Sequence, residues 1–187
     1  ENDSALYGEW LLMHMWKYLP NVAQMHAVLL EALRYLVLPA RSIPREEPFL
    51  FGSPTAFYVF YNVPGEGDEA AVNLAACLED FRRAQGSLGG GASQLFLAEL
   101  QYLRTNLSEA IVLAHTALPL AEREQQLGLM YGIALLLARI AVQQGNAKRV
   151  ALSLEMMDRY NEQLTPRAGK AMYEYIYQSV YSLILAI

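Results

Sequence analysis

The sequence predicts an all-α fold, an α-α superhelix of stacked helix hairpins with about eight or nine helices. Three observations support it. Apolar residues recur at intervals of three and four over most of the chain, no segment alternates with a period of two, and small or apolar residues repeat forty positions apart. Stacked hairpins need such repeats, because helices approach closely only where side chains are small.

The first hairpin is predicted to have a very short turn. Its first helix should begin after Asp3 and Ser4 and end near Pro20, and Asn21 can cap the second helix. The apolar stripes comprise Leu6, Trp10, Met13 and Lys17 in the first helix, and Val22, Met25, Leu29, Ala32 and Leu36 in the second.

A long inserted loop is predicted over 39–54, where four prolines interrupt the helical pattern. Ser53 and Pro54 suit the cap and first turn of the next helix. Asn106, with Glu109 three residues later, is a capping-box-like helix start. The later helices are predicted over 55–61, 68–85, 92–104, 108–124 and 129–144, with a last one beginning at Thr165-Pro166.

The repeat is clearest at the turns, because Gly65, Thr105 and Gly145 lie forty positions apart. The register then holds along the flanking helices. Its equivalent sets are Tyr58, Ala98 and Ala138; Ala70, Ala110 and Val150; Leu74, Ala114 and Leu154; and Cys77, Ala117 and Met157. The first hairpin fits if Met13 and Met25 are equivalent to Ala98 and Ala110.

Composition excludes several classes of protein. Hydrophobic residues make up 54% and charged residues 18%, so the chain can build a large core and is not of the disordered type. The formal net charge of −5 gives no basic surface for a nucleic acid. The most apolar windows are too short for a membrane span. Cys77 is the only cysteine, which rules out an intramolecular disulfide and favours a reducing, cytoplasmic compartment.

No catalytic, cofactor or metal site is predicted. His14, His26 and His115 lie on separate predicted helices, without a histidine or cysteine at the spacing of a helical metal site. The glycine-rich stretch 86–91 lacks the lysine of a phosphate-binding loop, and no G-x-S-x-G sequence is present. We therefore expect a binding protein and not an enzyme.

The stretch from Ala98 through Thr105-Asn106 to Ala117 resembles the tetratricopeptide repeat family in its small-residue positions. The period of forty is longer than the usual value of about 34. The closing proline is absent, and Pro119 lies inside a predicted helix, which it should kink. The resemblance implies a divergent superhelix over 1–187, in a chain that we interpret as a fragment of a larger protein.

A narrower motif runs from Phe51-Gly52-Ser53-Pro54 through Tyr61 to Pro64-Gly65 and Asp68-Glu69. It resembles the middle region of LuxR-type transcriptional regulators related to the maltose-operon activator. The resemblance implies an effector- or partner-binding sensor or coupling domain, with the nucleotide-binding module and the DNA-binding helix-turn-helix outside this fragment. A free-standing tetratricopeptide adaptor that binds protein segments is the alternative.

In tetratricopeptide-like arrays the first helix of each pair lines a concave groove, which implies a mixed aromatic and polar surface suited to a small effector or a peptide. The implied groove residues are Trp10, His14, Thr55, Val59, Asn62, Glu99, Tyr102, Arg139 and Gln143. Their aromatic members could instead pack against neighbouring hairpins. Tyr173, Tyr177 and Tyr181 share one face of the last predicted helix, through which we expect self-association or packing on a further segment.

Overall fold

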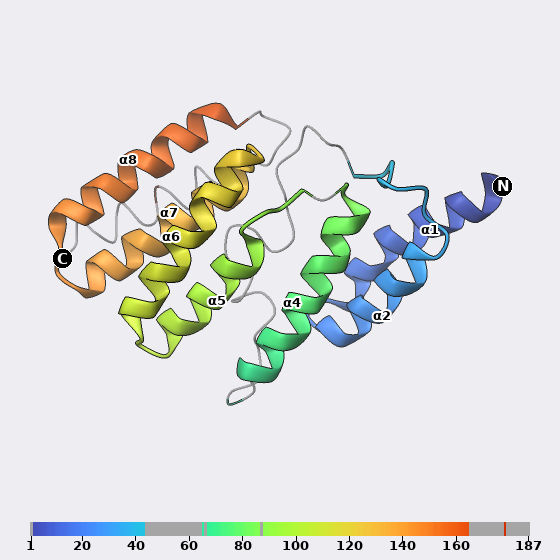
Figure 1. The fold of residues 1–187 in the computed structure, drawn as a ribbon, viewed down its shortest axis with the longest axis horizontal. Coiled ribbons are helices and arrows are strands. Elements are labelled where there is room, and N and C mark those ends of the chain that lie inside the picture. The colour runs from blue at the N-terminus through green and yellow to red at the C-terminus, as the bar shows by residue number, and fades with distance from the viewer. Residues whose placement is uncertain (1, 44–64, 66, 87, 165–177, 179–187) are drawn as a thin grey trace.

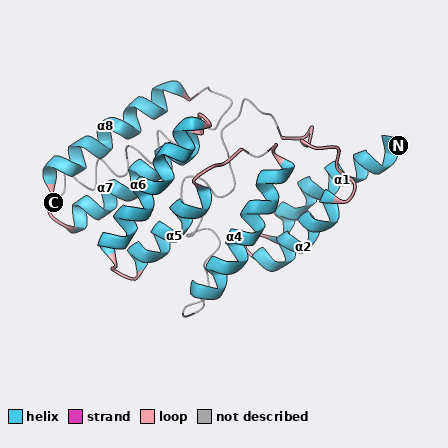
Figure 2. Ribbon diagram, viewed as in Figure 1, coloured by secondary structure: helices cyan, strands magenta, loops and turns pink. Residues whose placement is uncertain are grey.

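The computed structural model describes residues 2–43, 65, 67–86, 88–164 and 178. These residues form seven α-helices and one short 3-10 helix, and no strand occurs among them (Figures 1 and 2). The elements are α1 (Asn2–His14), η1 (Met15–Tyr18), α2 (Val22–Leu33), α4 (Gly67–Ala84), α5 (Ala92–Leu103), α6 (Leu107–Arg123), α7 (Leu127–Gln143) and α8 (Ala147–Gln163). The prediction of an all-helical fold is confirmed for this part of the chain.

Helices that follow one another in this order pack against one another. Each of the helices α1, α2, α4, α5, α6 and α7 contacts the next, and α5 also contacts α7. Figure 1 shows the result as a row, with α1 and α8 at opposite ends. The predicted helices over 55–61 and after Thr165-Pro166 lie outside the described residues, as does 44–54 of the predicted loop. The described part of that loop, 39–43, contains no helix.

The last three connections have the same geometry, spaced twenty residues apart. Thr105, Gln125 and Gly145 each adopt the left-handed conformation, with φ of 62°, 55° and 64°. The amide of the following residue donates to a carbonyl five residues earlier, over 2.9 Å in all three turns. This pattern is the Schellman motif, which ends one helix and leaves three residues before the next. The repeat therefore has a half-period of one helix plus one turn.

The buried faces follow the predicted forty-residue register. The buried side of α6 consists of Ala110, Ala114, Ala117 and Ala121. Ala98, Ala138, Leu74, Cys77, Leu154 and Met157 are buried as predicted, whereas Ala70 is half-buried and Ala71 takes the buried position beside it. Tyr58 lies outside the described residues. α6 continues through Pro119 to Arg123.

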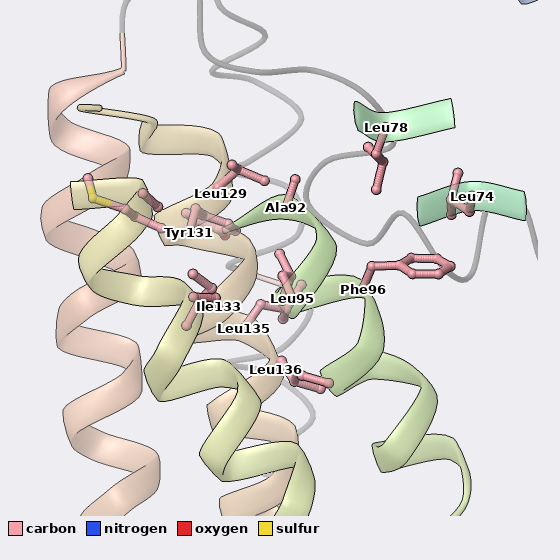
Figure 3. Packing of buried hydrophobic residues seen from close by; sticks show 14 of the residues in the cluster. Leu74, Leu78, Ala92, Leu95, Phe96, Leu129, Tyr131, Ile133, Leu135 and Leu136 are labelled. Atoms are coloured by element: carbon pink, nitrogen blue, oxygen red, sulfur yellow. The ribbon is translucent and has the colours of Figure 1, made fainter. Parts of the chain in front are cut away.

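Helix α7 lies in the core. Its nine residues 128–136 are all buried, as are Ala138, Ile140 and Ala141. A helix that is apolar on all sides belongs in an interior. Figure 3 shows Leu95 of α5 beside Leu135 of α7, and Phe96 of α5 extending toward Leu74 of α4.

The predicted face of α1 is wrong. Leu6, Trp10 and Met13 are 64%, 53% and 54% exposed. The buried residues on the first helical segment are instead Gly8, Leu11, Leu12 and Met15. Apolar residues surround α1 on nearly every side, so their spacing does not select a face. Gly8 determines which face of α1 packs against the protein, because a Cβ at this position would lie 2.8 Å from the Leu36 backbone nitrogen.

The connection between α4 and α5 is held in place by contacts with α6 and with Glu124, the residue that follows its carboxyl-terminal end. The Glu124 carboxylate accepts a hydrogen bond from the Gly90 amide over 2.6 Å. Gly91 has a φ of 91°, and a Cβ there would meet the Ala117 carbonyl oxygen at 2.5 Å. Only glycine permits this close approach to α6.

The two predicted helix caps have different outcomes. The predicted capping box at Asn106 does not form. The Asn21 side chain does cap α2, because it accepts a hydrogen bond from the Gln24 amide over 3.0 Å.

A polar pair joins α2 to α4. The Asp80 carboxylate lies 2.8 Å from His26 Nε2 and accepts from Arg83 over 2.7 Å. Burial raises the pKa of Asp80, but the hydrogen bonds from His26 and Arg83 outweigh this effect and hold the pKa below its ordinary value. The Asp80 side chain is 18% exposed, so solvent screens the pair only in part.

We predict that Thr105→Gly raises the free energy of unfolding by about 0.5 to 1 kcal/mol, because glycine adopts the left-handed conformation without a Cβ penalty. Gly145→Ala should lower it by about 1 kcal/mol. No atom lies within 4 Å of the added methyl group, so the cost is backbone strain alone. Urea unfolding measures both. Ser108→Gly, in the first turn of α6, is the control and should destabilise the protein; a gain there would contradict the explanation.

A second prediction concerns acid stability. Because the pKa of Asp80 is lowered in the folded state, its stabilising effect is fully present above its pKa in the unfolded chain. The effect is lost as the pH falls through the folded pKa. Asp80→Asn should therefore cost about 1 to 2 kcal/mol at neutral pH and flatten the loss of stability below about pH 4.

Glu79→Gln is the matched control for that measurement. Glu79 neighbours Asp80 on α4, but its side chain is 63% exposed and contacts Arg82 over 3.2 Å. Its removal should change the free energy of unfolding by less than about 0.5 kcal/mol. Equal losses for the two variants, measured by urea unfolding across pH, would show that the contact between Asp80 and His26 contributes nothing specific.

Candidate functional site

The described groove residues lie on three helices. Trp10 and His14 are on α1, Glu99 and Tyr102 are on α5, and Arg139 and Gln143 are on α7. The other three predicted residues, Thr55, Val59 and Asn62, lie outside the described residues.

Tyr102 and Arg139 come together across the α5 and α7 contact. The Arg139 guanidinium carbon lies 5.6 Å from the centre of the Tyr102 ring, which is the geometry of a cation–π contact. Both side chains are half-buried. The pair therefore presents one aromatic ring and one permanent positive charge at a partly exposed place between two helices.

The two predicted groove residues one helical turn away from this pair differ in exposure. Glu99, one turn before Tyr102 on α5, is only 1% exposed, whereas Gln143, one turn after Arg139 on α7, is exposed. Glu99 and Arg139 are forty positions apart, so equivalent sites of successive units carry opposite charges. We name Tyr102, Arg139 and Gln143 the α5–α7 wall; Glu99 is buried and is not part of this surface. Tyr102 and Arg139 are the predicted groove residues between which the described structure gives a contact from one helix to another.

Trp10 and His14 belong to a row of rings along α1 and η1. Their ring centres lie 4.5 Å apart in a stacked arrangement. Tyr7 stacks on Trp10 at 5.9 Å, and Tyr18 meets His14 edge-on at 5.8 Å. Tyr7 and Tyr18 were not predicted as site residues, although their spacing of three and four from Trp10 and His14 indicates this row.

The row and the α5–α7 wall are separate features. Figure 1 shows α1 at one end of the row of helices and α7 in its other half. Leu6, Tyr7, Trp10 and Met13 are each exposed by 45% or more, so α1 presents an apolar surface. The predicted groove residues that the structure describes thus form two groups and not one continuous surface.

Cys77 lies near the Asp80 and His26 contact, one turn before Asp80 on α4, but it does not resemble a catalytic thiol. The side chain is fully buried. Burial, with a smaller contribution from the Asp80 charge, raises the pKa of the thiol to about 12. The nucleophile in cysteine chemistry is the thiolate, which such an environment suppresses at neutral pH. Cys77 is a packing residue of the hydrophobic core.

The described residues contain no group of three or more histidine, cysteine, aspartate or glutamate side chains placed to hold a metal ion. Within the same residues, no helix has the length and apolar character needed to cross a membrane.

Comparisons of the chain with models of protein families, with curated proteins and with solved structures gave no match.

Proposed function

We propose that this chain is a binding module with a divergent tetratricopeptide-like superhelix, in which successive helix hairpins stack and leave an inner wall for a ligand. The sequential helix contacts and the additional contact of α5 with α7 support this architecture. The three equivalent turns at Thr105, Gln125 and Gly145 support it as well, because identical turns at equal spacing generate a regular stack.

The binding surface is the α5–α7 wall, and the observation that carries this proposal is the contact between Tyr102 and Arg139. A half-buried aromatic ring beside a guanidinium group can stack on a flat ligand group, and the guanidinium can also bind a carboxylate. Both partners are already placed by helices, which lowers the entropy cost of binding. The class of ligand is a small effector or a protein segment with an aromatic or acidic group.

We further propose that the module is the sensor or coupling domain of a LuxR-type cytoplasmic regulator. The motif from Phe51 to Tyr61 supports this proposal and lies outside the described residues. Its test is the reading frame of the parent gene, which should encode a nucleotide-binding module upstream and a helix-turn-helix downstream. Absence of both would favour the alternative, a free-standing adaptor. The exposed row of rings on α1 suits that alternative, because aromatic surfaces are common where proteins meet.

Self-association through Tyr173, Tyr177 and Tyr181 stays a prediction, since these residues lie outside the described part of the chain. Light scattering that finds only monomer would remove it.

The wall can be tested without knowing its natural ligand. We expect peptides selected from a displayed random library on the unaltered protein to bind about fivefold or more weakly to Tyr102→Ala and to Arg139→Ala, as measured by fluorescence anisotropy. The melting temperature should fall by no more than a few degrees, because both side chains are only half-buried. Loss of binding accompanied by equal loss of folding would count against the proposal.

Arg123→Ala is the matched control for these variants. Arg123 ends α6, and its side chain is 72% exposed and lies 3.6 Å from the Glu124 carboxylate. The variant removes the same charge as Arg139→Ala at a place away from the wall, so it should bind the selected peptides unchanged. Equal weakening by Arg123→Ala would show a general charge effect.

A further inference from the structure

We propose that a second site, a pocket bounded by α6, α7 and α8, binds a small monocarboxylate with an apolar body. This site lies apart from the α5–α7 wall and does not depend on what that wall binds.

The pocket is built from three successive helices. α7 packs against both α6 and α8 and contributes Ile140 and Ala141 between them. Ile111 and Leu118 of α6 line one side, and Met156 of α8 lines the other. Every residue named here is apolar, so the interior favours a hydrocarbon chain or ring over water.

The size of the pocket limits the ligand. Its volume is about 210 Å³. An apolar cavity of about 150 Å³ is sufficient for benzene, so this pocket has room for about eight non-hydrogen atoms of a ligand. A larger ligand would have to extend into solvent.

The polar groups of the pocket select the charge of the ligand. His115 and Arg149 line it from opposite helices, and Gln144 and Ser153 complete its polar lining. The lining contains no aspartate or glutamate. Arg149 forms no ion pair with any residue that the structure describes, and its guanidinium group donates only a long hydrogen bond of 3.4 Å to Gln144 Oε1. A guanidinium group so placed can bind a carboxylate through two parallel hydrogen bonds.

The position of Arg149 in α8 adds to the preference for an anion. It is the third residue of this helix, and the amino-terminal end of a helix carries a partial positive charge. The Arg149 amide donates to the Asn146 side chain over 3.1 Å, which holds this first turn in place. The side chain is exposed and stays available to a ligand.

Comparison with the preceding unit shows that these groups are not demanded by the fold. α4 and α6 begin forty residues before α6 and α8, so each pocket residue has an equivalent. Ala75, Glu109 and Leu113 stand where His115, Arg149 and Ser153 stand in the pocket. The helices that form the pocket therefore carry a basic residue where the preceding helices carry an acidic one, and polar residues at two positions that are apolar in the preceding helices. The preceding unit has its own cation, Arg104, at the position of Gln144, so the pocket differs from it by a second polar side of His115, Arg149 and Ser153.

The experiment uses octanoate as the probe and 1-octanol as its uncharged counterpart, both titrated into the full chain by isothermal titration calorimetry. We expect octanoate to bind more tightly than 1-octanol. Arg149→Gln should weaken octanoate binding about fivefold to tenfold and leave 1-octanol binding unchanged, because only the carboxylate uses the guanidinium group.

Two further variants make the test specific. Lys148→Gln removes the same charge from the neighbouring exposed position, which does not line the pocket, and should leave octanoate affinity unchanged. Ser153→Leu introduces the residue of the preceding unit and should reduce binding of both probes by filling the pocket, with its melting curve as the check on folding. Equal affinity for the two probes, equal effects of Arg149→Gln and Lys148→Gln, or full binding by folded Ser153→Leu would each overturn the proposal.

Discussion

The structure depends on the close approach of helices whose buried faces are made of small side chains. The buried face of α6 is a stripe of four alanines, and α5 and α7 both pack against this helix. Alanine contributes little apolar area, so stability comes from short distances between backbones and from many small contacts. Such an interface tolerates little added volume. The Gly91 contact with the Ala117 carbonyl follows from the same requirement.

Close approach in turn requires connections that do not separate the helices. Three residues are enough between α6 and α7 and between α7 and α8, because the left-handed residue reverses the chain while the Schellman hydrogen bond ends the helix. Thr105 and Gln125 adopt this conformation without being glycine. Packing of the helices on both sides must outweigh the local strain, which indicates that the interfaces and not the turns determine the hairpins.

Several features that depend on local chemistry could be predicted from the sequence, although the capping box at Asn106 was not among them. The alanines of α6, the glycine turn at Gly145 and the cap at Asn21 belong to this class, because each depends on residues a few positions apart. The buried face of α1 could not, since apolar residues surround that helix and only the approach of Leu36 to Gly8 selects a side. The contact between Tyr102 and Arg139 could not be predicted from the sequence either, because it depends on the offset between two helices. The half-period of twenty residues is not evident in the sequence, because Gln125 is not a typical turn residue.

The repeat also separates positions that are needed for packing from positions that can vary. Positions that recur as small or apolar residues, such as Ala98 and Ala138, are committed to packing, and a change there disturbs every neighbour. Positions between them differ from unit to unit: Glu99 becomes Arg139, Tyr102 becomes Val142 and Glu109 becomes Arg149. Glu99 is itself buried, but the other two positions are exposed or half-buried, so the changes there alter the chemistry of a surface and leave the buried faces unchanged. The binding surfaces that we propose therefore lie where successive units differ in sequence.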